Sequence, residues 1–260
     1  HYAVHSGPEA IRHEFDAEVS QKDLWETYLP AFEAAVKEGE VEAVMGAYNR
    51  TLGEPCCGSD LLIRKILRGK WGFQGHFVSD CWAISDFHLH HHITTTAPES
   101  AALAIKMGCD VNCGNTYLHL LRALEDGLIT EDDITTAAER LFTTRFMLGE
   151  FDENCEYNSI PYEVVECPEH LALSEEAARR SVVLLKNDGI LPLDKAKIKT
   201  IGVIGPNAND RMALIGNYHG TASRYITVLE GIQDYVGDDV RVLYAEGCHL
   251  YNCLLYTSPS

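Results

Sequence analysis

The chain has 260 residues, of which 46% are hydrophobic and 23% are charged, and its formal net charge is −18. This length and composition suit one large or two modest packed domains and exclude a disordered chain. A chain this acidic repels phosphate backbones, so nucleic acid is not an expected partner. No apolar run approaches the roughly 20 residues of a membrane helix, so a membrane is not an expected partner either.

The first part of the chain alternates helical and strand patterns. In order, these predict a helix over 23–37, a strand over 41–48, a loop over 49–58, a helix from Ser59 or Asp60 through Leu67, and a strand over 76–79. Trp71, Gly72 and Phe73 lie between the second helix and its following strand and mark the turn that joins them.

Further along, the patterns predict a helix over 98–107, a short strand over 109–112 and a helix over 130–148. Thr130 and Asp133 have the spacing of a capping box at the start of the last of these helices. Regular alternation of strands and helices predicts a parallel α/β domain.

Residues 152–168 differ in character. They are rich in Glu, Asn and Pro and have no apolar period, so we expect a linker there. The patterns that follow predict a helix over 169–181, strands over 182–185 and 200–204, a helix over 228–235 and a strand over 240–244. The expected domains are therefore 1–151 and the start of a second α/β domain over 169–252. The tail over 253–260 fits neither, and we interpret it as non-native.

The nine cysteines are too few for a disulfide scaffold in a chain of this length, and none forms a CxxC pair. Zinc-ribbon and thioredoxin-like sites are therefore not expected. The simplest interpretation is buried, unreactive thiols, with Cys56 and Cys57 as loop neighbours that are not bonded to each other.

Residues 71–80, WGFQGHFVSD, carry the first candidate chemistry. A helix ends, a turn with glycine follows, and a strand runs into Asp80. Ligands of parallel α/β folds gather at the carboxyl ends of strands, so Asp80 is placed to meet a substrate. The alternative is that Asp80 caps the next helix.

Several motifs in a fixed order make this pattern more specific. They are VMGAYN at 44–49, GEP at 53–55, LL at 61–62, ILR at 66–68, WGF at 71–73 and VSD at 78–80, followed by LLKNDGILPL at 184–193 and VIGPNAND at 203–210. The set resembles glycoside hydrolase family 3, and His1-Tyr2 resembles the end of that family's Lys-His-Phe/Tyr motif. The resemblance covers roughly residues 1 to 250.

This resemblance implies an α/β fold class, with the C-terminal part of a TIM-like barrel followed by the beginning of an α/β sandwich. It also implies exo-acting, retaining cleavage of terminal β-linked sugars without a cofactor. Retention needs two carboxylates about 5 to 5.5 Å apart, one that attacks the anomeric carbon and one that serves as acid and base. Asp80 matches the nucleophile. Glu230 and Glu246 come too early for the acid/base, which we expect beyond Ser260, so the chain alone should be very weakly active.

Three more residues match positions that contact the sugar. His1 matches a residue that binds sugar hydroxyls, Tyr48 one that lies beside the nucleophile and donates a hydrogen bond to it, and Met45 one that makes an apolar contact. Each has a plainer alternative, which is a frayed terminus for His1, a barrel-wall tyrosine for Tyr48 and core packing for Met45.

Cys81 departs from many β-glucosidases of the family, which have Trp directly after the nucleophile. The β-xylosidase branch often has Cys there, bonded to a second Cys, and Cys113 in DVNCG at 110–114 resembles that partner. A disulfide here would crowd the place of a hexose hydroxymethyl group, so the resemblance implies a substrate contact at Cys81 and favours pentosides such as xylose or arabinose. Two unpaired thiols are the alternative.

Two weaker signals suggest other ligands. His88, His90, His91 and His92 lie close together, but neighbouring histidines in a loop point apart and no Cys or acid completes a tetrahedral set, so no metal is expected. GVIGPN at 202–207 lacks the GxGxxG spacing, which counts against a nucleotide-binding enzyme.

The other function that stays open is a sugar-binding relative on the same scaffold that has lost catalysis. Such a protein would be expected to lose its nucleophile, and Asp80 is retained. The sugar, the linkage, the oligomeric state and the compartment are not determined by the sequence.

Overall fold

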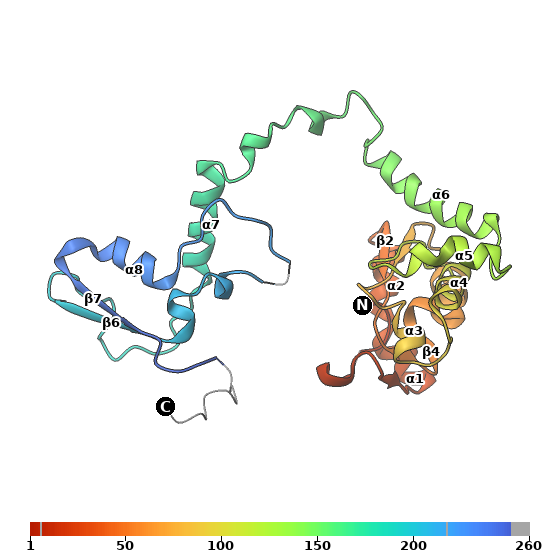
Figure 1. Ribbon diagram of the computed structural model, residues 1–260, viewed down its shortest axis with the longest axis horizontal. Coiled ribbons are helices and arrows are strands. Elements are labelled where there is room, and N and C mark those ends of the chain that lie inside the picture. Colours follow the sequence, from red (N-terminus) through yellow and green to blue (C-terminus); the bar gives the residue numbers. More distant parts are fainter. Residues whose placement is uncertain (6, 217, 251–260) are drawn as a thin grey trace. The chain divides into compact units, whose positions relative to one another are not determined.

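The computed structural model describes residues 1–5, 7–216 and 218–250, so the tail expected over 253–260 lies outside the described residues. The chain forms two compact units, of which the first covers His1–Asn158 and the second begins at Ser159 (Figure 1). In the described ranges, no helix is both long and apolar enough to cross a bilayer.

Short parallel strands form the centre of the first unit. β2 (Ala43–Met45) pairs in parallel with β5 (His76–Val78), in a register that places Met45 opposite Val78. On its other side, Val78 forms a parallel bridge with Val111. The strands expected over 41–48 and 76–79 are therefore present but shorter than their apolar patterns, and the strand expected over 109–112 is reduced to the single bridge at Val111.

The expected loop over 49–58 contains more order than its composition indicates. β3 (Arg50–Thr51) and β4 (Glu54–Pro55) pair as an antiparallel hairpin, and β3 also pairs in parallel with β1 (Asp16–Ala17). The two connecting residues, Leu52 and Gly53, both have positive φ angles of 52° and 83°, which is the backbone that a two-residue hairpin turn requires. Strands of two residues leave no periodicity to detect.

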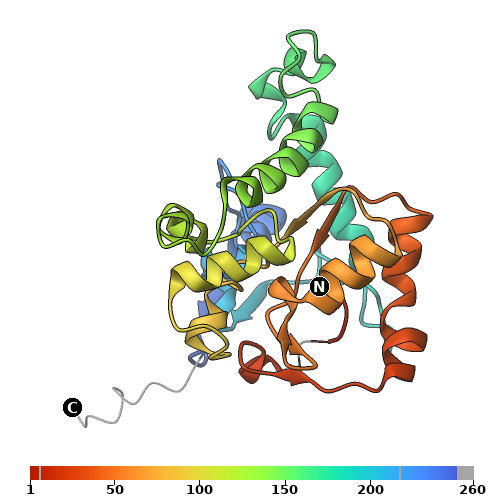
Figure 2. The same ribbon diagram turned by 90° about the vertical axis from the view of Figure 1, so that its right-hand side faces the viewer.

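Helices surround these strands (Figure 2). They are α1 (Gln21–Asp23), which continues through a π-helical turn at Leu24–Tyr28 into α2 (Pro30–Lys37), a π-helix over Asp60–Lys70, α3 (Asp86–Leu89), α4 (Ala97–Met107), α5 (Leu120–Glu125) and α6 (Glu131–Met147). Two expected starts are confirmed, since Ser59 accepts a hydrogen bond from the N–H of Leu62 and Thr130 forms a capping box with Asp133.

Tyr2 lies in the main hydrophobic core. Its ring packs edge-on against Phe32, Trp71 and Phe77, with ring centroids 5.2, 5.9 and 6.3 Å away. Its hydroxyl donates to the carbonyl of Leu62 at 3.0 Å, and burial raises the pKa of Tyr2. Because Tyr2 is only 1% exposed, this packing holds the first residues of the chain against the unit.

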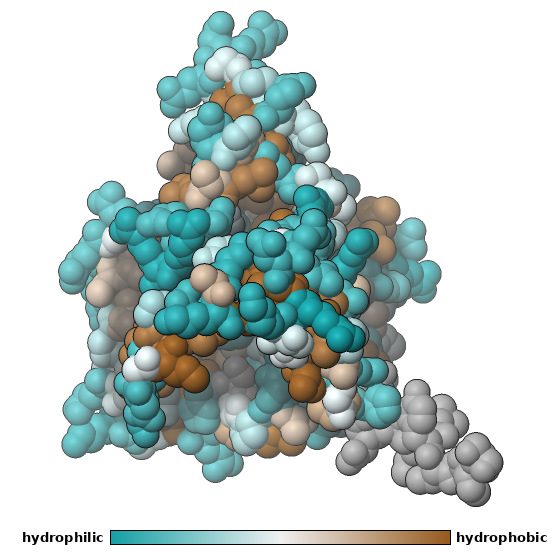
Figure 3. All heavy atoms as spheres, turned by 90° about the vertical axis from the view of Figure 1, so that its left-hand side faces the viewer, coloured by the Kyte–Doolittle hydropathy of each residue, from teal (hydrophilic) through white to brown (hydrophobic). Residues whose placement is uncertain are grey.

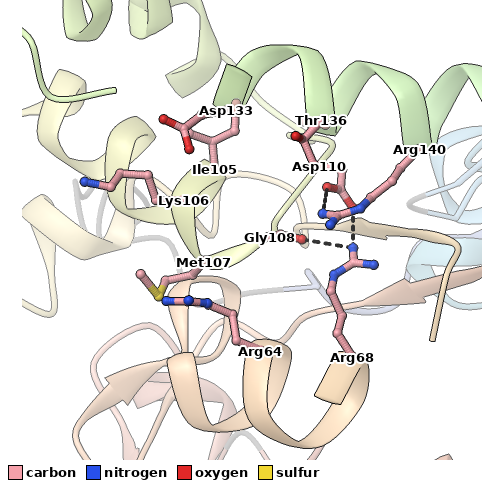
Figure 4. Close-up of a pocket in the computed structure, with 11 residues that line it drawn as sticks. Arg64, Arg68, Ile105, Lys106, Met107, Gly108, Asp110, Asp133, Thr136 and Arg140 are labelled. Atoms are coloured by element: carbon pink, nitrogen blue, oxygen red, sulfur yellow. Dashed lines mark hydrogen bonds and ion pairs between the residues drawn. The ribbon is translucent and has the colours of Figure 1, made fainter. Parts of the chain in front are cut away.

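A buried ion-pair cluster ties two helices to the strands. Asp110 accepts from Nη2 of Arg68 at 2.6 Å and from Nη1 of Arg140 at 2.9 Å (Figure 4). The backbone N–H of Phe77 donates to the same carboxylate at 2.8 Å. Asp110 therefore joins the helix Asp60–Lys70, α6 and β5. None of the expected sugar-contacting residues lines the pocket of about 240 Å³ beside this cluster.

The second unit contains a βαβ arrangement. After α7 (Pro168–Ser181), β6 (Thr200–Ile204) pairs in parallel with β7 (Arg241–Ala245), and α8 (Val228–Val236) connects them. The prediction of a strand over 182–185 is wrong. Its apolar run resembles a buried strand, but its side chains are 62% to 91% exposed and it pairs with no other described segment.

Apolar side chains reach the surface in several patches (Figure 3). An apolar groove of the second unit has a volume of about 490 Å³ and lies between β6, α8 and the segment before them. Residues that line it include Leu193, Ile198, Ile201, Ile232 and Tyr235.

Candidate active site

Neighbouring chain segments of the first unit end at one edge of its parallel strands. The N–H of Tyr2 donates to the carbonyl of Met45 and the N–H of Gly46 donates to that of Val78, both at 2.9 Å. Val78 in turn bridges Val111. Because the carboxyl ends of parallel strands meet at one edge, the residues that follow them come close together.

Asp80 follows β5 by two residues and is 6% exposed. Its Oδ1 accepts from the backbone N–H of Cys81 at 2.7 Å, and its Oδ2 contacts Nε2 of His1. Both carboxylate oxygens therefore have a partner that can donate. Asp80 does not cap the next helix, because α3 begins at Asp86, directly after Ser85.

A disulfide joins the ends of two neighbouring segments beside Asp80. Cys81 and Cys113 are bonded, with their Cα atoms 4.3 Å apart. Two hydrogen bonds support the connection, since the N–H of Trp82 donates to the carbonyl of Cys113 at 2.6 Å and the N–H of Cys113 donates to the Ser79 hydroxyl at 3.0 Å. The chain on both sides of Asp80 is therefore fixed to the segment after Val111.

The other residues expected to contact a sugar lie at the same edge. The rings of His1 and Tyr48 are 6.0 Å apart, so the structure brings His1, Tyr48 and Asp80 together. Met45 is the last residue of β2 and is 39% exposed, and it lines a groove of about 160 Å³ with His1. Met45 is thus not a core residue.

Three residues near Tyr48 were not predicted from the sequence. The guanidinium carbon of Arg12 lies 4.7 Å from the centre of the Tyr48 ring, and the ring of His13 lies 4.6 Å from it. Nδ1 of His13 is 2.8 Å from Oδ2 of Asp86. Burial raises the pKa of Asp86, and the hydrogen bond to His13 opposes that change. No motif marks this contact, because it joins residues far apart in the sequence. The available signal was an acid inside the mostly apolar stretch AISDF at 83–87.

The four neighbouring histidines His88, His90, His91 and His92 do not form a shared metal site. His88 contacts the Ser100 hydroxyl, and His90 lies 3.7 Å from Asp86. His91 is buried, and burial lowers the pKa of His91 to about 4. Among the residues that the structure describes, no group of three or more His, Cys, Asp or Glu side chains is arranged to hold a metal ion.

The free cysteines near this edge are buried. Cys56 and Cys57 are not bonded to each other, and Cys57 donates to the carbonyl of Ala47 at 3.4 Å. Burial raises the pKa of the Cys56 thiol to about 12 and that of the Cys57 thiol well above its usual value. Both are therefore protonated and unreactive at neutral pH.

Comparison with known families explains this arrangement. Residues 1–144 match the Glycosyl hydrolase family 3 N terminal domain, and residues 182–249 match the Glycosyl hydrolase family 3 C-terminal domain. This chain belongs to glycosyl hydrolase family 3. It is 41% identical to a xylan 1,4-beta-xylosidase of Xylanibacter ruminicola over 97% of this chain and 30% of that protein. It is 39% identical to beta-xylosidase/alpha-L-arabinofuranosidase 1 of Medicago sativa subsp. varia over 97% of this chain and 33% of that protein.

Solved structures of the family have the same fold. A GH3 exo-beta-xylosidase (XlnD) in complex with a xylobiose aziridine activity based probe matches with a TM-score of 0.81 and 32% identity, over 97% of this chain and 33% of that one. A beta-glucosidase from Listeria innocua in complex with glucose matches with a TM-score of 0.71 and 28% identity, over 92% of this chain and 33% of that one. The expected α/β fold class is confirmed, and the chain spans about a third of the length of these relatives.

Proposed function

We propose that this family 3 chain is part of an exo-acting β-glycosidase that cleaves terminal β-linked sugars with retention of configuration. Asp80 is the nucleophile in this proposal. The observation that carries it is a carboxylate at the carboxyl end of a parallel strand, with His1 and Cys81 as partners of its oxygens and Tyr48 beside them. Such a carboxylate is held in one orientation, which an attack on a single carbon atom requires.

In the first step, an oxygen of Asp80 bonds to the anomeric carbon as the bond to the leaving oxygen breaks. The leaving oxygen takes a proton from a second carboxylic acid, which later removes a proton from the incoming water. We assign that acid/base role to a glutamate C-terminal to Ser260. Glu230, the acid at the start of α8, is instead paired with Arg224 at 2.6 Å, which suits a surface ion pair.

We propose pentosides, xylosides above all, as the substrates. The Cys81–Cys113 disulfide lies directly after Asp80, where it reduces the room for the hydroxymethyl group of a hexose. The names of the relatives from Xylanibacter ruminicola and Medicago sativa subsp. varia support the same choice. Met45 offers the apolar contact for the sugar ring, and His1 a polar contact for its hydroxyls.

Covalent labelling tests the proposal. The protein expressed from the complete gene is incubated with a 2-fluoro β-xyloside that carries a dinitrophenolate leaving group, and its mass is measured before and after digestion. We expect one adduct, on the peptide with Asp80, that is absent in Asp80→Asn and present in the surface control Asp132→Asn. The matching 2-fluoro β-glucoside should label more slowly. An adduct on another carboxylate would overturn the assignment of Asp80, and no adduct with either sugar would overturn the retaining mechanism.

A further inference from the structure

A chain of three contacts runs from a buried acid to the ring of Tyr48. Asp86 contacts Nδ1 of His13 at 2.8 Å, and Nε of Arg12 donates to Nε2 of His13 at 3.3 Å. The guanidinium of Arg12 then lies over the ring of Tyr48, 4.7 Å from its centre. Each side chain in the series therefore orients the next.

Only one protonation state of His13 satisfies both of its ring contacts. Arg12 has donors only, so Nε2 of His13 must accept and carry no proton. Nδ1 then carries the proton and donates to Asp86, whose side chain is 4% exposed. The buried carboxylate thus sets the tautomer of His13, and that tautomer provides the acceptor that Arg12 needs.

We propose that Asp86 and His13 are a positioning pair that holds Arg12 across the face of Tyr48 and so shapes the sugar subsite beside Asp80. This inference rests on the proposed glycosidase function and adds two residues to it. A flexible arginine side chain loses conformational entropy when it binds a ligand. A hydrogen-bond acceptor that already holds the arginine in place reduces this loss, so the arginine binds its ligand more tightly. The aromatic ring contributes a weaker, cation–π contact to the same orientation.

Arg12 faces a place where a sugar hydroxyl can reach it. Its side chain is 36% exposed and forms an ion pair with Glu9 at 2.9 Å through Nη1, and Nε contacts His13. Among the described residues, no salt bridge is formed by the third guanidinium nitrogen, Nη2. Tyr48 is in turn 6.0 Å from the ring of His1, which contacts Asp80. Arg12 and His1 are therefore both neighbours of the Tyr48 ring, and Arg12 offers N–H donors to a neutral, hydroxyl-rich ligand.

A double-mutant cycle tests whether His13 acts through Arg12. In the protein expressed from the complete gene, His13→Ala and Arg12→Ala should each lower kcat/KM for an aryl β-xyloside by about 10- to 100-fold, the range for losing a hydrogen bond to a charged group. The double variant should be no worse than the poorer single variant, because the effect of His13 has to pass through Arg12. Most of the change should appear in KM.

Conservative variants separate positioning from folding. Asp86→Asn keeps an oxygen that accepts from Nδ1, so it should retain most activity, whereas Asp86→Ala should behave like His13→Ala. His13→Ala/Asp86→Ala removes both partners and leaves no buried charge unpaired, so it remains measurable if a single alanine variant unfolds. His119→Ala is the control, because His119 is an exposed histidine of the same unit, and it should change kcat/KM by less than about twofold.

Additive effects of the His13 and Arg12 substitutions, or an Asp86→Asn variant as impaired as Asp86→Ala, would overturn the positioning role. A fall in kcat at unchanged KM would also overturn it, because that result places the pair's effect on Asp80 and not on sugar binding. The labelling of Asp80 is measured on the wild-type protein alongside. If Asp80 labels normally and the cycle is additive, only the positioning pair fails; if Asp80 does not label, the proposed function fails and this inference falls with it.

Discussion

Removing the Cys81–Cys113 disulfide should destabilise the first unit and relax its choice of sugar. The two cysteines are 32 positions apart in the sequence. A cross-link over a loop of that length restricts the unfolded chain by an entropy worth about 3.7 kcal/mol at 25 °C. A domain's total stability is typically about 5 to 15 kcal/mol, so this one bond accounts for about a quarter of it or more.

Urea titration of Cys81→Ala/Cys113→Ala measures the effect. The first unit holds all three tryptophans of the chain, Trp25, Trp71 and Trp82. Their fluorescence therefore reports its unfolding, and for a urea slope of about 1 to 3 kcal/mol/M the midpoint should fall by about 1 to 4 M. Cys155→Ala/Cys167→Ala is the matched control, because these are free and only partly buried thiols, and it should shift the unfolding free energy by less than about 0.5 kcal/mol.

Two further readouts decide the interpretation. Dithiothreitol should lower the wild-type midpoint to that of the double variant and leave the double variant unchanged. The ratio of kcat/KM for an aryl β-xyloside to that for the β-glucoside should fall when the bond is absent, since the hydroxymethyl group gains room beside Asp80. A double variant within about 1 kcal/mol of the wild type under oxidising conditions would refute the stability argument, and an unchanged ratio would refute the steric one.

Three other substitutions follow from the packing. Asp110→Ala should cost about 3 to 5 kcal/mol in urea titrations, because two partly buried guanidinium groups lose their shared, buried carboxylate. Asp132→Ala at the exposed start of α6 should cost less than about 1 kcal/mol, and equal losses would contradict this role. Burial lowers the pKa of His91 from 6.5 to about 4. As the pH falls, the unfolded chain therefore takes up this proton before the folded chain does. The free energy of unfolding should decrease by up to about 3 kcal/mol between pH 6.5 and pH 4. His91→Gln should lose that part of the pH dependence, and a slope equal to that of the wild type would rule the explanation out. Thr96→Ala removes the side-chain cap of α4 and should lower the thermal midpoint by the equivalent of about 1 kcal/mol, unlike Thr95→Ala, which has only a backbone contact there.

The elements that could be predicted from the sequence are those with local signals. Apolar spacing over several turns marked the helix that ends at Met107, and the capping-box spacing of Thr130 and Asp133 marked the start of α6. The position of Asp80 also followed from local order, because a strand that ends in an acid places that acid at the strand's carboxyl end. In each case the residues that determine the structure are neighbours in the sequence.

Features that depend on distant residues could not be predicted. The run over 182–185 is apolar enough for a strand, but a strand needs a paired neighbour, and none of the described segments pairs with it. The contact of His13 with Asp86 and the cluster around Asp110 join residues from separate helices and loops, so no spacing in the sequence indicates them. The Cys81–Cys113 pairing came from a family resemblance, since nine cysteines allow many pairings.

In the proposed site, the groups that position Asp80 differ from those that we propose to border the sugar. Backbone hydrogen bonds between parallel strands position Asp80, and such bonds depend little on which side chains follow the strands. The groups that we propose to border the sugar are side chains, namely Cys81 with Cys113 after two of these strands, and Arg12 with His13 in the segment before β1. On this proposal, changes in these side chains should alter sugar preference while leaving the backbone contacts that position Asp80 in place.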